Sequence, residues 1–112
     1  PENHIKIMKR LLDNHPKLML DITWRVLEDN YFKNHRRIYT RFFNDYSERI
    51  LPGTDFVASS NKNFESYKTD LEVTSQIHKY LSDEAFRNIV LGNNYFKLLG
   101  LDYEAPEIFI SN

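Results

Sequence analysis

An aspartate that could take part in catalysis lies in the segment RILPGTDFVAS, residues 49 to 59. A short apolar run meets a Pro-Gly-Thr-Asp sequence that ends at Asp55, and Phe56 follows at once. One interpretation is the floor of an active site, where a carboxylate within hydrogen-bond reach of a reacting proton can act as a general base. The alternative is a surface turn, because Pro, Gly and Asp are ordinary turn residues. The segment alone leaves both interpretations open.

The other residues with metal-binding side chains form no local motif. Asp21 lies inside a second apolar run, KLMLDITW, where an unpaired carboxylate would be costly, so we expect it to pair with a basic group or a backbone amide. The four histidines are His4, His15, His35 and His78. None of them stands in an HxH or HExxH pattern. We expect His78, which lies on an apolar helical stripe, to be a packing or partly exposed residue.

The bulk composition is that of a soluble globular protein with a single domain over residues 1–112. The net charge of -1 leaves no basic excess for a nucleic acid, and the cluster Arg36, Arg37 and Arg41 is interpreted as a solvated helix face. The absence of cysteine excludes disulfides and thiolate metal sites and suits a cytoplasmic protein. No run reaches the roughly 18 apolar residues of a membrane span. We therefore expect neither a nucleic acid nor a membrane as partner.

Helical periodicity alternates with short apolar runs along the chain. Apolar residues recur at spacings of three and four in residues 2–13, 33–48 and 62–81, which predicts helices. Strands are expected at about residues 17–23 and 49–57. This order favours βαβ units and a parallel sheet. Two parallel strands do not form a stable sheet alone, so the sequence predicts a piece of a larger fold.

Four single residues predict where helices and strands begin or end. Pro52 cannot donate to a central ladder and limits the second strand. Ser82 is the expected N-cap of a helix, because Asp83 and Glu84 follow it. Gly92 and Gly100 are expected to end two successive short helices.

Three segments together resemble the C-terminal part of the metal-dependent amidohydrolase family, in the branch related to aminocarboxymuconate-semialdehyde decarboxylase. They are HPKLMLDITW, RILPGTDF and LSDEAFRNIVLGNNYFKLLGLD, and the resemblance spans roughly residues 4 to 103. The family motifs are matched by Gly53-Thr54-Asp55, by Asn93 or Asn94, and by Leu98-Leu99-Gly100-Leu101. The resemblance implies an α/β fold, in which this chain is a helix-rich fragment with the last two βα units and the C-terminal helices of a (β/α)8 barrel.

The resemblance also implies a function. Asp55 would lie at the mouth of the barrel and serve as metal ligand and general base of a hydrolase or decarboxylase that acts on a small molecule, with zinc as the expected ion. The histidines that the family contributes from earlier strands have no counterpart here, so we expect the chain alone to hold no metal, to be inactive and to self-associate through open strand edges. The alternative is a non-enzymatic, mostly helical protein-interaction module, for which the aromatic content of 14% could provide an apolar docking surface.

Overall fold

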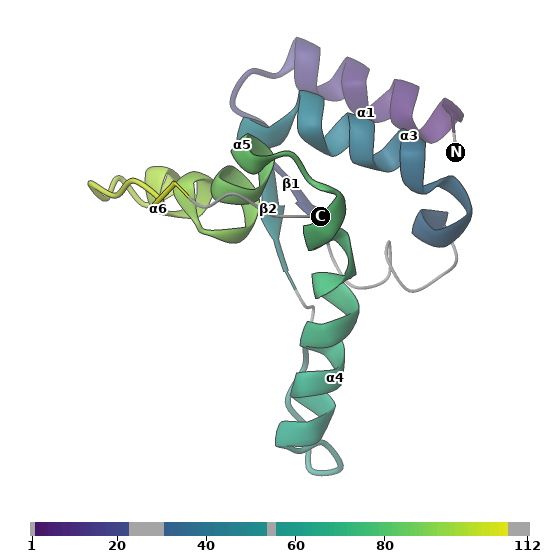
Figure 1. The fold of residues 1–112 in the computed structure, drawn as a ribbon, viewed down its shortest axis with the longest axis vertical. Helices are drawn as coiled ribbons and strands as arrows, with labels where there is room; N and C mark the ends of the chain where they lie inside the picture. The colour runs from purple at the N-terminus through teal and green to yellow at the C-terminus, as the bar shows by residue number, and fades with distance from the viewer. Residues whose placement is uncertain (1, 23–30, 54–55, 108–112) are drawn as a thin grey trace.

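A helix, a strand, a second helix, a second strand and a series of short helices follow one another along the chain (Figure 1). The computed structural model describes residues 2–22, 31–53 and 56–107. The elements are α1 (Glu2–Asn14), β1 (Leu20–Ile22), α3 (Tyr31–Asp45), η1 (Ser47–Arg49), β2 (Ile50–Pro52), α4 (Phe64–Thr74), η2 (Ser75–Tyr80), α5 (Asp83–Ala85), η3 (Phe86–Val90) and α6 (Asn93–Leu98). No helix in these ranges has the length and the apolar character that a membrane span requires.

The two strands pair in parallel, as the alternating pattern predicts. Leu20 lies opposite Ile50 and Ile22 lies opposite Pro52, and α3 lies between the two strands in the chain. A parallel pair needs such a crossover, so the three elements form one βαβ unit. Both strands are shorter than the predicted 17–23 and 49–57, and the second ends at Pro52, which has no N–H for a further ladder hydrogen bond.

Helices supply most of the core. Helices α1 and α3 lie side by side above the sheet, and η3 packs near β2 (Figure 1). The largest fully buried side chains come from α1, α3, β2 and η3, and they are Leu12, Tyr39, Phe42, Ile50 and Ile89. In β1 the side chain of Ile22 is buried whereas that of Asp21 is exposed, as expected for a strand whose side chains alternate between two faces.

The residues expected at the helix ends lie where the sequence predicts them. The hydroxyl of Ser82 accepts a hydrogen bond of 3.1 Å from the backbone N–H of Ala85 and so caps α5. Gly92 and Gly100 have φ angles of 96° and 70°. Glycine adopts this left-handed region without a Cβ penalty, which explains why one short helix ends near each of them.

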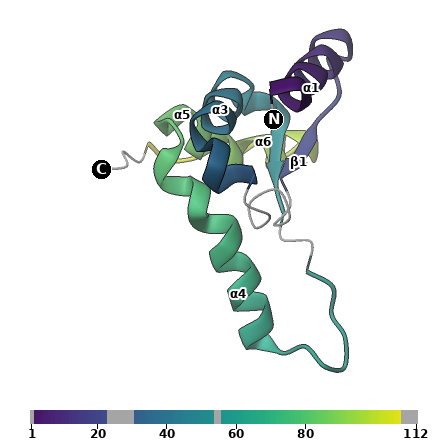
Figure 2. The same cartoon turned by 90° about the vertical axis from the view of Figure 1, so that its right-hand side faces the viewer.

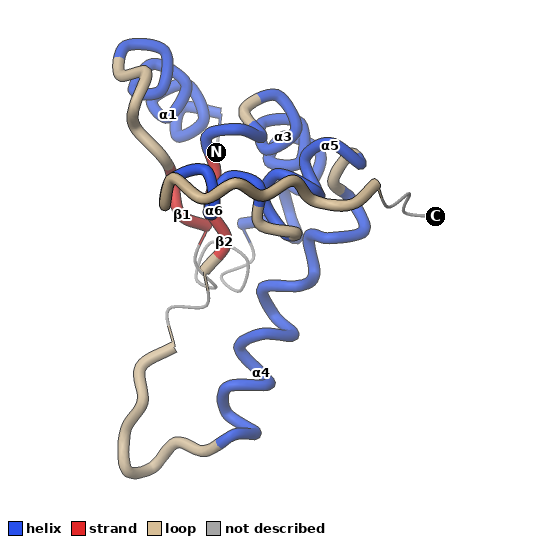
Figure 3. Tube along the Cα trace, turned by 90° about the vertical axis from the view of Figure 1, so that its left-hand side faces the viewer, coloured by secondary structure: helices blue, strands red, loops and turns tan. Residues whose placement is uncertain are grey.

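Helix α4 projects away from the rest of the described chain (Figure 2). Residues 56–63 run out to its tip and lead into a capping box at Asn63 (Figure 3). The predicted helix over 62–81 is divided, because α4 ends at Thr74 and continues as the 3-10 segment η2. The hydroxyls of Thr74 and Ser75 both donate to the carbonyl of Leu71. Such side-chain bonds compete with the regular helical ladder.

Candidate functional site

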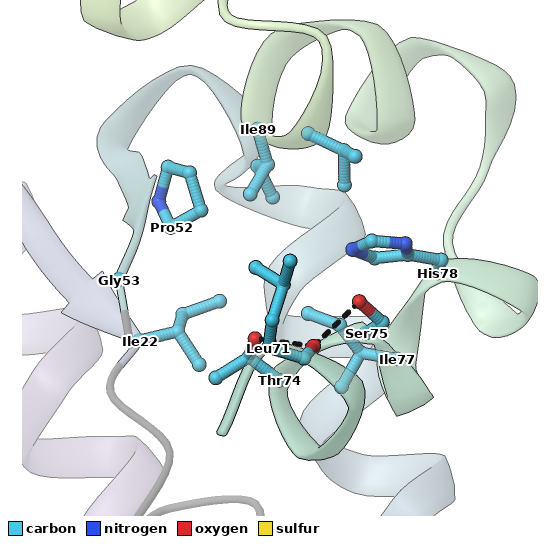
Figure 4. A pocket seen from close by; sticks show the side chains of 10 residues that line it. Ile22, Pro52, Gly53, Leu71, Thr74, Ser75, Ile77, His78 and Ile89 are labelled. Atoms are coloured by element: carbon cyan, nitrogen blue, oxygen red, sulfur yellow. Dashed lines mark hydrogen bonds between the residues drawn. The ribbon is translucent and has the colours of Figure 1, made fainter. Parts of the chain in front are cut away.

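A cavity of about 290 Å³ lies at the ends of the two strands, between the sheet and the start of η2 (Figure 4). The strands contribute an isoleucine, a proline and a glycine, and the opposite walls come from α4, η2 and η3. The lining residues are Ile22, Pro52, Gly53, Leu71, Thr74, Ser75, Ile77, His78, Ile89 and Val90.

One helical stripe forms a wall of this cavity. Leu71, Thr74 and His78 recur at spacings of three and four, which puts them on one side of a helix. The periodicity of residues 62–81 predicts that shared face, and the cavity confirms it. The sequence does not show that the strand ends of β1 and β2 lie opposite this stripe, because that depends on the packing of distant segments.

The hydroxyls in the wall are already engaged with the backbone. Thr74 Oγ1 donates to the carbonyl oxygen of Leu71 at 2.9 Å, and Ser75 Oγ donates to the same oxygen at 2.7 Å. Their protons therefore point toward the helix, and the two oxygens can only accept from a ligand.

His78 is the ionisable residue in the described part of the lining. Its ring meets the ring of Phe86 edge to face, at 5.7 Å between centroids and 82° between planes. Burial lowers the pKa of His78 from its ordinary value of 6.5, because the charged imidazolium loses water there. The imidazole is consequently neutral at pH 7, with one nitrogen that donates and one that accepts. The predicted role as a half-buried packing residue is confirmed.

The carboxylate of Asp21 lies directly against Gly53 on the neighbouring strand. A Cβ atom at position 53 would lie 2.6 Å from Oδ1 and 3.0 Å from Oδ2 of Asp21. Glycine is therefore the residue that leaves room for this carboxylate. The close approach gives the glycine of the Gly-Thr-Asp motif a steric reason, which the sequence alone does not reveal.

Thr54 and Asp55 lie outside the described residues. The predicted metal and general-base role of Asp55 therefore stays a prediction. Within the described part of the chain, no three His, Cys, Asp or Glu side chains come together in a group that could hold a metal. His4 instead makes a hydrogen bond of 3.1 Å from its Nδ1 to the hydroxyl of the buried Tyr39.

Two polar side chains hold the backbone around the start of β2. Arg49 Nη2 donates to the carbonyls of His15 and Leu18 at 2.6 and 2.7 Å. The buried Asn94 donates from Nδ2 to the carbonyls of Ser47 and Ile50 at 2.6 and 2.7 Å. The sequence analysis singles out Asn94, together with Asn93, whereas nothing in the sequence distinguishes Arg49 from other basic residues.

No family model matches the sequence, and neither a curated protein nor a solved structure matches the chain.

Proposed function

We propose that the chain supplies the last two βα units and the closing helices of a metal-dependent barrel enzyme of the amidohydrolase type. The observation that carries this proposal is the parallel pairing of β1 with β2 across the helical crossover α3. A (β/α)8 barrel repeats this unit, with helices on the outside and the alternate side chains of each strand directed inward. The face of the sheet that carries Asp21 and Leu51 would then belong to the interior of the barrel.

Asp55 follows Gly53 by two positions, immediately after the described end of the strand. Active sites of such barrels lie at the C-terminal ends of the strands. In the proposed enzyme Asp55 binds a divalent ion, with zinc as the expected metal, together with nitrogen or oxygen ligands from other segments. Its carboxylate takes the proton of an attacking water in the hydrolysis or decarboxylation of a small-molecule substrate.

The test compares Asp55→Asn with Asp102→Asn in the longest natural chain that contains this sequence. Asp102 is exposed and serves as the matched control. We expect Asp55→Asn to lower turnover by about 10²–10⁴-fold and to reduce the bound metal, with a cooperative fold retained, whereas Asp102→Asn leaves both unchanged. Turnover and metal content close to those of the wild type in Asp55→Asn would contradict the proposal.

A protein-interaction module is the second candidate, and the exposed apolar face of α4 favours it. Phe64, Tyr67 and Leu71 are 73%, 38% and 44% exposed. An apolar face of this kind commonly marks a surface that binds another protein. Replacing Phe64 and Leu71 by serine should then abolish the binding of a protein partner, measured by calorimetry, and leave metal content unchanged. Intact partner binding in this double variant would argue against the module.

A further inference from the structure

We propose that the cavity at the strand ends binds a small, uncharged aromatic molecule with one hydrogen-bonding group, such as an indole or a phenol. The proposal concerns the cavity walls alone and does not rest on the metal chemistry proposed above. The cavity measures about 290 Å³, close to the lower limit of roughly 300 Å³ for ligand pockets. A dry cavity of about 150 Å³ is sufficient for benzene. One ring or a fused pair of rings therefore fits.

Buried isoleucines of the hydrophobic core form the inner walls of the cavity. Ile22, Ile77 and Ile89 are 5%, 4% and 0% exposed, so their positions are set by packing on the side away from the cavity. Leu71 is 44% exposed and forms part of the open side. A ring that enters the cavity removes its own apolar surface and part of the exposed surface of Leu71 from water, which is favourable.

The described part of the walls favours an uncharged ligand. The described lining contains no Asp, Glu, Lys or Arg side chain, so a charged ligand would lose its water without gaining an ion pair. The imidazole of His78 points into the cavity (Figure 4), and in its neutral form it can accept a hydrogen bond from an N–H or O–H group. An uncharged ring with one N–H or O–H group needs no ion pair and can donate a hydrogen bond to His78.

Indole and 1-methylindole are suitable probes, because they differ in the N–H donor. We expect saturable shifts in the methyl NMR signals of Ile22, Ile89 and Val90 when either compound is titrated into the purified chain. Indole should bind about two- to tenfold more tightly, as one additional hydrogen bond predicts. In His78→Leu this difference should disappear while 1-methylindole still binds. Equal affinities of the two probes in the wild type, or a difference that persists in His78→Leu, would overturn the role of His78.

The position of the site is tested by a matched pair of variants on α4. Leu71→Trp places an indole side chain at the cavity wall, whereas Thr69→Trp places one at an exposed position on the opposite face of the same helix. We expect Leu71→Trp to weaken probe binding by about tenfold or more and Thr69→Trp to leave it unchanged. Indole-3-carboxylate should bind more weakly than its uncharged analogue 3-methylindole. Shifts that do not saturate, equal effects of the two variants, or tight binding of the carboxylate would overturn the proposal.

Discussion

His78 couples protonation to folding, because burial lowers the pKa of its imidazole below the ordinary value of 6.5. Between the folded-state pKa and pH 6.5 the unfolded chain binds a proton that the folded chain does not, so the free energy of unfolding rises with pH in that window. We expect the contribution of neutral His78 to be complete above pH 6.5 and to be lost as the pH falls through the folded-state pKa. Urea unfolding between about pH 5 and pH 8 measures this dependence.

Two variants separate His78 from the other histidines. His78→Gln removes the titrating group, so its stability should depend less on pH over this window. His15→Gln is the matched control, because it removes a histidine that is exposed in the turn after α1. A full wild-type pH dependence in His78→Gln would show that the response arises at another group.

The contact between Asp21 and Gly53 predicts a specific steric cost. In Gly53→Ala the new Cβ atom would lie 2.6 Å from Oδ1 of Asp21, so the carboxylate must move. We expect the variant to lose less than about 1 kcal/mol of unfolding free energy, because the obstructing atoms are the end of an exposed side chain that can rotate away. In the Asp21→Ala background the same substitution should cost less, because the obstructing carboxylate is absent. A double-mutant cycle by urea unfolding measures the coupling, and additive effects would refute the steric explanation.

Sequence patterns predict which side chains share a face better than they predict which faces meet. The stripe of Leu71, Thr74 and His78 follows from local periodicity, and the structure confirms it. The opposing walls, Ile22 and Pro52, are about twenty or more positions away in the chain, and only the parallel register brings them to the same cavity. Asp55, the residue that the motif singles out, lies outside the described residues, so its role rests on the sequence.

The guanidinium of Arg49 joins two elements, since it connects the start of β2 to the end of α1 and the turn that follows. Its Nε and Nη2 donate to the Leu18 carbonyl, and Nη2 also donates to the His15 carbonyl. We expect Arg49→Met to lose about 2–3 kcal/mol in urea unfolding, because charge-assisted hydrogen bonds are lost and partly buried carbonyls remain unpaired. Arg41→Met, at an exposed position on α3, should change stability by less than about 0.5 kcal/mol. A loss of stability in Arg49→Met no greater than in this control would show that the hydrogen bonds of Arg49 do not stabilise the connection between α1 and β2.

Helices are predicted more completely than strands for a physical reason. The hydrogen bonds of a helix are local, so the period of residues 2–13 specifies α1 almost to its last residue, Asn14. The extent of a strand depends on its partner, and the predicted 17–23 and 49–57 shorten to Leu20–Ile22 and Ile50–Pro52 in a two-stranded sheet. The helix also divides at Thr74, where the hydroxyls of Thr74 and Ser75 both donate to the Leu71 carbonyl, and the spacing of apolar residues does not predict this division.

Three features of the molecular surface favour association. Within the described residues the sheet contains two strands, so each strand has one edge without a strand partner. Helix α4 has no buried residue and projects from the body (Figure 2). The closing helices add Leu98 and Leu99, which are 61% and 53% exposed. Open edges and apolar surface of this kind recruit other chains.

We therefore expect the purified chain to self-associate and to enhance the fluorescence of an apolar dye, with sedimentation velocity over a range of concentrations as the measurement. Phe64→Lys combined with Leu71→Lys should shift the chain toward the monomer, because the charges disrupt the exposed apolar face of α4. Thr69→Lys combined with Gln76→Lys adds the same charge at exposed polar positions and should leave the association unchanged. A chain that remains monomeric at every concentration and binds no dye would contradict the view that these strands and helices need further βα units.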